Sequence, residues 1–361
     1  MLTVVELFSG IGGFRIACDN LGISTVWAND HDALASGVYR KRFGKKNFHE
    51  GDIENLTHLI PEEFDLLTAG FPCQPFSSAG KKKGIDDPRG SLYQTIHDIL
   101  KSKNPSFFML ENVKRLLTMK KGNTFRTILY TLAELDYDIE WRLVNAQSFS
   151  LPQNRERVVI IGTKGKQSAS PILIDNPDLS TSKNLLEKKG SFSNWGFLRG
   201  NQITEMDASS FVVKNPNSKL RDILQNPKEV EERFYFTDST ISRLGENTPR
   251  NKFHQGVEIL SNQEGGRRMG YTVFGTNGVA PTLTRTTSRI YERYKVGSEY
   301  RILTNIEYAR LQGFDDDHCE LTQSLDGLVE EVPVMKQYKL YGNALPPNIA
   351  EWAIKRLVNT Q

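Results

Sequence analysis

The chain has 361 residues, of which 38% are hydrophobic and 25% are charged, a balance typical of globular proteins. No stretch approaches the roughly 18 consecutive apolar residues of a membrane-spanning helix, and the N-terminus lacks the features of a signal peptide, so we expect a cytoplasmic protein without membrane contacts. The formal net charge of +3 does not by itself indicate a nucleic-acid-binding protein, so any basic surface must be local.

Strands and helices are predicted to alternate through the first 162 residues. An apolar run at 4–8 predicts a strand, 9–13 a turn, and Phe14, Ala17 and Leu21 recur at helical spacing. Further strands are predicted at 25–28, 65–69, 107–110 and 158–161, and helices over 92–100 and 125–135. This alternation favours an α/β fold with a doubly wound, mixed sheet.

The pattern changes after residue 163. Clusters of Ser, Asn, Gly and Pro replace the regular alternation until about Gly297, and order returns near Arg301. We therefore predict one domain formed by 1–163 and 300–361, interrupted by a smaller, irregular and β-rich domain at 164–299. A final helix is expected to begin at Pro346-Pro347-Asn348.

A glycine-rich turn follows the first predicted strand. Gly10, Gly12 and Gly13 let the backbone approach a ligand closely, and the helix behind them favours an anion. Asp30 ends the second strand about 20 residues later, where an acid typically binds ribose hydroxyls. Asp52 is a candidate for contact with an adenine amino group. A tight turn and a capping carboxylate are the simpler explanations of these residues.

The turn suits S-adenosylmethionine better than a nicotinamide dinucleotide. The dinucleotide fingerprint requires a glycine at the position of Arg15. S-adenosylmethionine carries a carboxylate, a ribose and an adenine, which match a glycine loop and two acids at strand ends.

Cys73 is the candidate nucleophile. The other cysteines, Cys18 and Cys319, are far away in the sequence, and neither a C-x-x-C pair nor an H-x-x-x-H spacing is present, so we expect no disulfide framework and no structural metal. Cys73 follows a strand in a segment bounded by Pro72 and Pro75, and active sites of α/β proteins lie at such strand ends. Nearby cations favour the thiolate, although a single cysteine is more often an inert core residue.

Three charged residues are candidates for holding a substrate. Glu111 follows the strand at 107–110, where desolvation can keep a carboxyl protonated at neutral pH. Arg155 and Arg157 are two residues apart and are predicted to point the same way, which suits a carbonyl oxygen and a phosphate. Taken singly, each is also typical of a surface charge.

Together these motifs resemble the DNA cytosine-5 methyltransferase family in its compact bacterial restriction-modification form. The resemblance covers roughly 1–162 and 300–361, in the family's order. The motifs that carry it are Glu6–Phe14, Pro72-Cys73-Gln74, Glu111-Asn112-Val113, Gln153-x-Arg155-x-Arg157, Arg301–Thr304 with Glu307–Phe314, and Tyr341-Gly342-Asn343-Ala344.

The resemblance implies transfer of a methyl group from S-adenosylmethionine to C5 of a cytosine flipped out of duplex DNA, with S-adenosylhomocysteine as product. It implies that Cys73 attacks C6, that Glu111 holds N3 and the amine, that Arg157 binds O2, and that Arg155 fixes the ring or a phosphate. The cofactor-binding residues that it implies are Phe8, Gly10, Gly12, Gly13, Asp30, His31, Asp52, Ile53, Pro72 and Asn343.

The chain departs from the family pattern at four positions. Asp30 stands where the family usually has Glu, and His31 stands where a large apolar or aromatic residue often packs on adenine. Asp315 replaces a frequent Pro and Ala344 a frequent Ser. The first two departures bear on cofactor affinity and not on the class of enzyme.

The domain at 164–299 is the expected DNA target-recognition domain, because Pro281–Arg285 resembles the end of that domain in the family. Basic residues suit phosphate and base contacts, with aromatic residues between them. The residues in question are Arg250, Lys252, Arg267, Arg268, Arg285, Arg289, Arg293 and Lys295, with Tyr271, Phe274, Tyr291 and Tyr294. The loop 77–87, which contains Lys81-Lys82-Lys83, is a candidate lid over DNA or a solvated loop.

Three other functions are alternatives to this one. A tRNA cytosine-5 methyltransferase would use the same motifs, but the RNA-acting branch has a smaller inserted domain. A non-catalytic DNA-binding homologue would not need the complete catalytic set, and a nicotinamide oxidoreductase is disfavoured by Arg15. We expect a monomer whose functional partner is a cognate restriction endonuclease.

Overall fold

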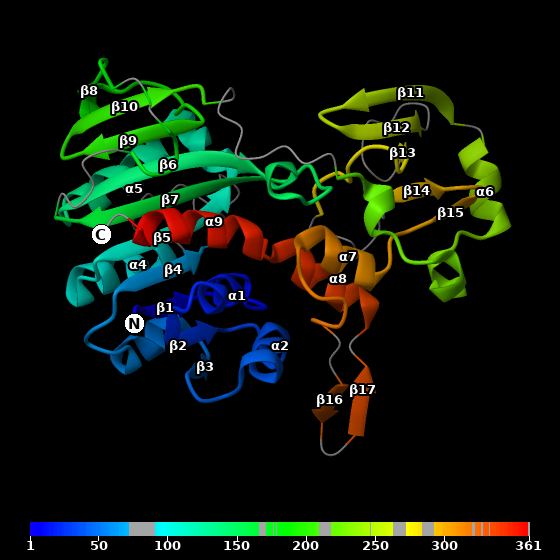
Figure 1. Ribbon diagram of the computed structural model, residues 1–361, viewed down its shortest axis with the longest axis horizontal. Helices are drawn as coiled ribbons and strands as arrows, with labels where there is room; N and C mark the ends of the chain where they lie inside the picture. The colour runs from blue at the N-terminus through cyan, green and yellow to red at the C-terminus, as the bar shows by residue number, and fades with distance from the viewer. Residues whose placement is uncertain are drawn as a thin grey trace. The chain divides into compact units, whose positions relative to one another are not determined.

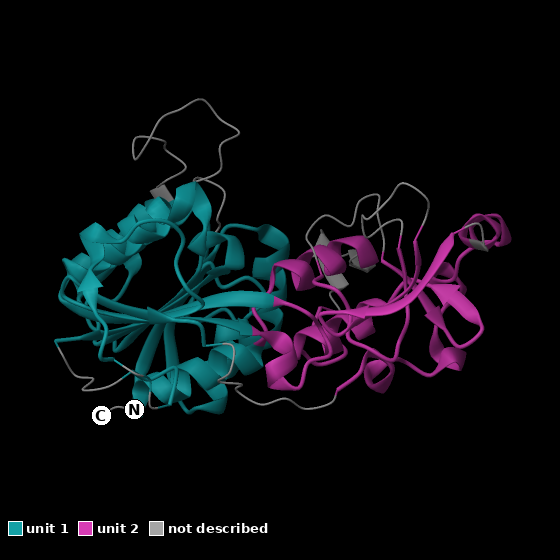
Figure 2. Cartoon of the chain, turned by 90° about the horizontal axis from the view of Figure 1, so that it is seen from above, with its two compact units in different colours: residues 1–144, 156–212, 347–361 teal, residues 145–155, 213–346 magenta. Residues whose placement is uncertain are grey.

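The chain folds into two compact units. A computed structural model describes residues 1–71, 91–165, 171–175, 177, 179–208, 218–245, 247–262, 272–283, 292–319, 322–325, 328–331 and 333–359. Unit 1 consists of 1–144, 156–212 and 347–361, and unit 2 consists of 145–155 and 213–346 (Figure 2).

Unit 1 is built on a ten-stranded sheet with the order β3-β2-β1-β4-β5-β7-β6-β9-β10-β8 (Figure 1). The first five strands of this order, β3, β2, β1, β4 and β5, run parallel to one another. The next strand, β7, is antiparallel to β5. The strands are β1 (Thr3–Leu7), β2 (Ser24–Asp30), β3 (Phe48–Glu50), β4 (Leu66–Gly70), β5 (Phe107–Val113), β6 (Tyr137–Asn145), β7 (Glu156–Lys164), β8 (Lys183–Asn184), β9 (Trp195–Arg199) and β10 (Gln202–Met206).

The strand order reverses between β1 and β4. From β1 the chain proceeds outward to β2 and β3, and then returns to place β4 and β5 on the other side of β1. Leu7 lies opposite Ala69 in the β1–β4 pair. The segments that follow these two strands therefore leave the sheet side by side, at the point where ligands bind in open α/β sheets.

Helices cover both faces of this sheet. They are α1 (Gly13–Asn20), α2 (Ala33–Phe43), α3 (Ile53–Leu56), α4 (Ser91–Lys103), α5 (Asn123–Ala133) and α9 (Pro347–Val358). Residues of α4 and α5 share a core cluster with Val5 and Leu7 of β1, whereas α9 packs on α1 at the opposite face (Figure 1). The predicted helical stripes are buried because each faces an apolar strand surface. The doubly wound α/β fold is confirmed.

The boundaries of the two units differ from the boundaries of the predicted domains. β9 pairs antiparallel with β6 and extends the large sheet, so 164–212 belongs to unit 1. Residues 300–346 belong to unit 2, because β15 pairs with β14 there. Strand pairing sets these boundaries, and the irregular composition of 164–299 gives no sign of it.

Unit 2 contains a five-stranded sheet, β11-β12-β13-β14-β15, and a separate two-stranded hairpin. The strands are β11 (Thr248–His254), β12 (Val257–Asn262), β13 (Thr272–Phe274), β14 (Arg293–Val296), β15 (Glu299–Arg301), β16 (Thr322–Leu325) and β17 (Leu328–Glu331). Its helices are α6 (Asp238–Gly245), α7 (Asn305–Gln312) and α8 (Val334–Asn343). The expected β-rich character is found here.

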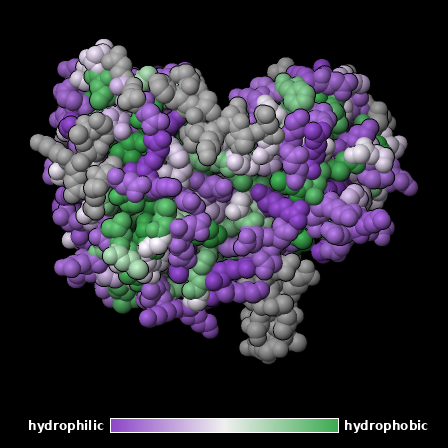
Figure 3. Space-filling view, in the orientation of Figure 1, coloured by the Kyte–Doolittle hydropathy of each residue, from purple (hydrophilic) through white to green (hydrophobic). Residues whose placement is uncertain are grey.

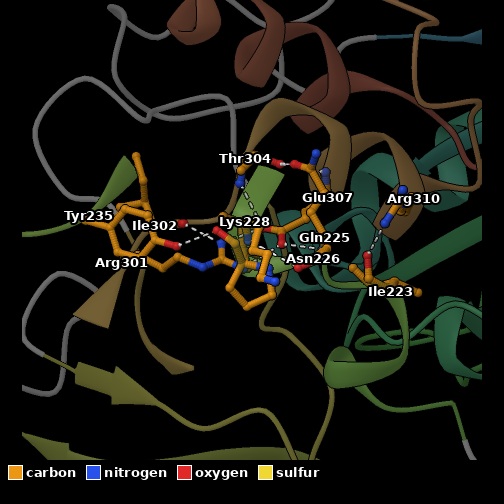
Figure 4. A network of polar contacts seen from close by, with 12 residues as sticks. Ile223, Gln225, Asn226, Lys228, Tyr235, Arg301, Ile302, Thr304, Glu307 and Arg310 are labelled. Carbon is orange, nitrogen blue, oxygen red and sulfur yellow. Dashed lines mark hydrogen bonds and ion pairs between the residues drawn. The ribbon is translucent and has the colours of Figure 1, made fainter. Parts of the chain in front are cut away.

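A buried ion pair organises the start of α7 (Figure 4). Arg301 donates to both carboxylate oxygens of Glu307, at 2.7 and 2.6 Å, and the two side chains are 2% and 0% exposed. Glu307 also accepts the backbone N–H of Thr304 and of Gln225, each at 2.9 Å. Thr304 caps the helix in return, by accepting the Glu307 N–H at 3.2 Å. The motif around these residues is therefore structural.

Hydrophilic residues predominate among the described residues on the face shown in Figure 3, and apolar residues gather in separate patches between them. Exposed large hydrophobic residues are few among those described: Met1, Leu59, Val113, Leu179, Leu186 and Phe253. None of the described helices has the length and hydropathy of a membrane span.

We expect Glu307→Gln to lower the free energy of unfolding by about 3 kcal/mol or more, because it leaves the buried Arg301 charge unpaired. Chemical denaturation followed by circular dichroism measures the change. The double variant Arg301→Met/Glu307→Leu removes both charges and should recover part of the loss. An unchanged midpoint for Glu307→Gln would contradict the structural role of the pair.

Candidate active site

The glycine loop after β1 has an unusual backbone. Phe8 has a φ of 53°, and Gly10 and Gly12 have φ values of 55° and 91°. A bulky residue such as Phe rarely adopts a positive φ, and such strain is typical of functional sites. A Cβ on Gly12 would lie 2.2 Å from the Phe43 ring, whereas a Cβ on Gly10 would meet no atom within 4 Å. The loop is packed at Gly12 and leaves open space at Gly10.

Asp30 fastens this loop to the end of β2. Its carboxylate accepts the backbone N–H of Gly10 at 2.7 Å and that of Asp32 at 2.8 Å, and the residue is 8% exposed. Burial raises the pKa of Asp30, and the two backbone hydrogen bonds oppose this shift. His31 lies beside it with a largely exposed side chain. Ribose binding by Asp30 stays a prediction.

Asp52 and Ile53 follow β3 at the same edge. Asp52 is exposed and caps α3 by accepting the Glu54 N–H at 3.2 Å, while Ile53 is buried in the core. Asn29 holds this region in place, because its Nδ2 donates to the carbonyls of His49 and Gly51, each at 2.9 Å. The sequence analysis does not single out Asn29, although a polar residue directly after the apolar run at 25–28 is a usable signal.

Glu111 and Arg157 form an ion pair at the end of β4. β5 continues past the predicted strand to Val113 and includes Glu111, which lies opposite Gly70. Arg157 Nε is 2.7 Å from Glu111 Oε1, and the two side chains are 10% and 13% exposed. Burial lowers the pKa of Arg157, and the Glu111 carboxylate opposes this shift. A Cβ on Gly70 would lie 3.3 Å from Glu111 Oε2.

Pro72, Cys73 and the candidate lid 77–87 lie outside the described residues, but the flanks of their segment are well anchored. The Phe71 carbonyl accepts a hydrogen bond from Asn112 Nδ2 at 3.0 Å, and the Phe71 ring is 5.9 Å from that of Tyr93 in α4. Cys73 follows Gly70 by three residues, which span at most about 11 Å.

Arg155 and Arg157 make different contacts, contrary to the expectation that both guanidinium groups are aimed at one site. Arg155 is fully buried in unit 2 and donates to the carbonyls of Leu283, Gly342 and Ala344 at 3.0, 3.0 and 2.8 Å. The strict alternation of strand side chains does not apply, because Arg155 precedes β7. Its described contacts are those of a residue that holds the backbone together.

Asn343 ends α8 in unit 2 and is exposed. The other described cofactor candidates, from Phe8 to Ile53, all lie in unit 1. The preceding residue, Gly342, is held through its carbonyl by Arg155. Arg155 thus fixes the backbone next to Asn343.

A family model described as C-5 cytosine-specific DNA methylase matches residues 2–359. The chain belongs to this family. The match explains why the glycine loop, the Glu111 strand and the Arg155–Arg157 segment occur in a fixed order along one chain. As a C-5 cytosine-specific DNA methylase, the protein is a DNA cytosine-5 methyltransferase.

Curated relatives agree with this assignment. The chain is 33% identical to the type II methyltransferase M1.ScrFI of Lactococcus lactis subsp. cremoris, over 98% of this chain and 77% of that protein. It is 29% identical to M.HhaI of Haemophilus parahaemolyticus, over 97% and 92%. A match to M.NgoBI of Neisseria gonorrhoeae reaches 46% identity, but it spans only 45% of this chain and 50% of that protein.

Solved structures support the fold. The Dnmt2 methyltransferase of S. pombe superposes with a TM-score of 0.68 at 18% identity, covering 99% of both chains. The Entamoeba histolytica methyltransferase EhMeth gives 0.64 at 19% identity, covering 99% of this chain and 98% of its own. At these identities the likeness concerns the fold alone.

We expect Arg155→Lys to lower the free energy of unfolding by about 2 kcal/mol, because an ammonium group cannot reproduce hydrogen bonds to three separate carbonyls. The matched control is Arg233→Lys, at an exposed ion pair of the same unit, where little change is expected. Denaturant midpoints measure both. Equal midpoints for the two variants would refute the structural role of Arg155.

Proposed function

We propose that Cys73, Glu111 and Arg157 perform the cytosine-5 methylation that the family assignment indicates, with S-adenosylmethionine as the methyl donor. The observation that carries this proposal is the position of the Glu111–Arg157 pair, whose carboxyl lies against Gly70 at the end of β4. That strand leads into Cys73 within three residues. We therefore expect the Cys73 thiol to act at the strand end where the carboxyl and the guanidinium group meet.

The chemistry follows from these three groups. Cytosine C5 is a poor nucleophile until the Cys73 thiolate bonds to C6 and converts the ring into an enamine. Glu111 holds N3 and the exocyclic amine and supplies a proton as negative charge develops, while Arg157 binds O2. C5 would then take the methyl group that S-adenosylmethionine supplies, leaving S-adenosylhomocysteine, and release of the C5 proton restores the ring and expels the thiolate. The ion pair between Glu111 and Arg157 sets both groups in place before the base arrives.

The other two cysteines do not compete for this role. Cys18 is 1% exposed and Cys319 is 0% exposed. Burial raises the pKa of the Cys18 thiol, which removes the thiolate that a nucleophile needs. By elimination, Cys73 is the cysteine that suits attack on a base.

The residues around the glycine loop fit S-adenosylmethionine. Open space at Gly10 admits a ligand against the backbone, and Gly13 begins α1, whose N-terminus favours a carboxylate. When bound, this cofactor supplies a methyl group on a sulfonium. We propose that Phe8, Gly10, Gly12, Gly13, Asp30, His31, Asp52 and Ile53 hold it, with Pro72 and Asn343 as further contacts.

The proposed substrate is a specific sequence in duplex DNA. The type II names of the relatives favour a role in restriction-modification, in which the protein protects DNA from a cognate endonuclease. We propose that it acts as a monomer. A stacked base hides C6, so the target base must be flipped out.

Unit 2 is the proposed sequence reader, and β11 exposes Arg250 and Lys252. The expected aromatic contacts Phe274 and Tyr294 are 4% and 1% exposed, so they belong to its core instead.

A tRNA substrate is the alternative to be tested. Transfer of labelled methyl groups to duplex DNA, compared with transfer to tRNA, decides between them. We expect incorporation into DNA, and bisulfite sequencing of the product identifies the target sequence. Incorporation into tRNA alone would refute the proposed substrate.

We expect Cys73→Ser to bind the cofactor normally but to lower kcat at least about 1,000-fold, because a hydroxyl is a far weaker nucleophile than a thiolate. The wild-type protein should also become covalently trapped on DNA containing 5-fluorocytosine, whose C5 has no removable proton. Cys319→Ala is the matched control and should be trapped normally. Trapping of Cys73→Ser would end the assignment.

We expect Glu111→Gln to lower kcat by about 100- to 10,000-fold, because the amide keeps the shape of the carboxyl but cannot supply the proton. The matched control is Glu156→Gln, whose partly exposed carboxylate pairs with Lys114. Single-turnover methylation rates measure both. A kcat for Glu111→Gln within a few fold of wild type would exclude proton transfer by Glu111.

A further inference from the structure

Glu6 is a buried acid that the proposed chemistry does not use. It lies in the middle of β1 and is 1% exposed. Its neighbours Val5 and Leu7 point into the apolar core, so alternation places Glu6 on the opposite face of the sheet, under α1 and α2. An isolated carboxylate in such a position is costly, and its presence therefore requires an explanation.

Ionisable groups from two helices face this carboxyl. Tyr39 of α2 is 1% exposed and donates its hydroxyl to Glu6 Oε2 at 2.8 Å. From α1, Arg15, Cys18 and Asp19 are close enough to interact electrostatically with Glu6. Arg15 is itself engaged by Asp19, at 2.8 Å from each carboxylate oxygen. Tyr39 thus supplies the side-chain hydrogen bond to Glu6, and the backbone of Arg15 supplies a further one.

A packed path joins Glu6 to the glycine loop. The Tyr39 ring lies 4.8 Å from the Phe43 ring, one helical turn further along α2. Phe43 fills the space beside Gly12, where a Cβ would be only 2.2 Å from its ring. The Arg15 guanidinium lies 5.2 Å from the centre of the same ring. Glu6 also precedes Phe8, the strained residue of the loop, by two positions.

We propose that Glu6 and Tyr39 are positioning residues for the cofactor loop: their hydrogen bond holds Phe43 against Gly12, and ionisation of Glu6 weakens cofactor binding. The proposal rests on the proposed function of the loop as the S-adenosylmethionine site. Neither residue is assigned a contact with the cofactor. Both act through Phe43 and the backbone of the loop.

The sign of the pH dependence follows from burial. Desolvation raises the pKa of Glu6 to about 8, although the hydrogen bond from Tyr39 and the charge of Arg15 oppose this shift. The carboxyl is therefore mainly neutral at pH 7 and ionises at mildly alkaline pH. Because its pKa in the folded protein exceeds the ordinary value, the neutral form stabilises the packed arrangement at low pH, and this contribution is lost as the pH rises through about 8.

The decisive experiment compares cofactor affinity in the full chain and in Glu6→Gln between pH 6.5 and 9. A glutamine keeps an oxygen for the Tyr39 hydroxyl and stays neutral. Calorimetric titration with S-adenosylhomocysteine measures the Kd of both proteins at each pH. The ratio of the wild-type Kd to the variant Kd should rise about tenfold between pH 7 and 9. Taking this ratio cancels the titration of the ligand itself. At pH 6.5 the two proteins should bind equally.

Two further variants separate positioning from mere packing. Tyr39→Phe keeps the ring against Phe43 but removes the hydroxyl that lowers the pKa of Glu6, so its loss of affinity should move to higher pH. Glu50→Gln changes a partly exposed acid of the same unit, paired with Arg40, and should retain the wild-type profile.

The outcomes are distinguishable. A Glu6→Gln profile that parallels the wild type, or a Tyr39→Phe midpoint that does not move, would overturn the proposal while leaving the methyltransferase function intact. Absence of S-adenosylhomocysteine binding by the wild type at every pH would instead refute the proposed cofactor site. If Glu6→Gln fails to fold, the Tyr39→Phe midpoint alone decides.

Discussion

The parallel pairing of β1 with β4 is the constraint on which the site depends. Backbone hydrogen bonds fix Leu7 opposite Ala69, and the next pair in the sheet fixes Gly70 opposite Glu111. The glycine loop, the segment that leads to Cys73 and the Glu111–Arg157 pair therefore start from one edge of three adjacent strands. A change of register in any of these pairs would separate groups that the proposed chemistry needs together.

The carboxyl groups near this edge differ through their partners. Asp30 accepts two backbone N–H groups, Glu111 pairs with a guanidinium group, and Glu6 accepts the Tyr39 hydroxyl. Backbone donors oppose the rise in the pKa of Asp30 that burial causes, whereas burial dominates at Glu6 and raises its pKa to about 8. Similar side chains at similar depth thus have different roles: Asp30 fastens the loop, and in our proposals Glu111 holds the substrate base and Glu6 positions the cofactor loop.

Unit 2 uses buried arginines for its own construction. Arg155 donates to three backbone carbonyls, and Arg301 donates to Glu307 and to the carbonyl of Ile302. Both lie in motifs that match the family, yet their contacts are internal. The exposed cations of β11, Arg250 and Lys252, are better placed for DNA phosphates than either buried residue. Charge in a motif therefore indicates a nucleic-acid contact only where the side chain is accessible.

The sequence by itself determined the fold class, the family and the order of the motifs, because apolar periodicity and motif spacing are local properties of the chain. β1, β2, β4, β5 and β7 were predictable in this way. The tertiary structure alone decided that β6 is a strand, since its buried Asp138, Glu140 and Arg142 interrupt the apolar pattern and are satisfied by Arg199, Trp195 and Leu173, which follow much later in the chain. It also decided the different contacts of Arg155 and Arg157, the unit boundaries and the burial of Glu6, because desolvation and strand pairing depend on partners that no local window contains.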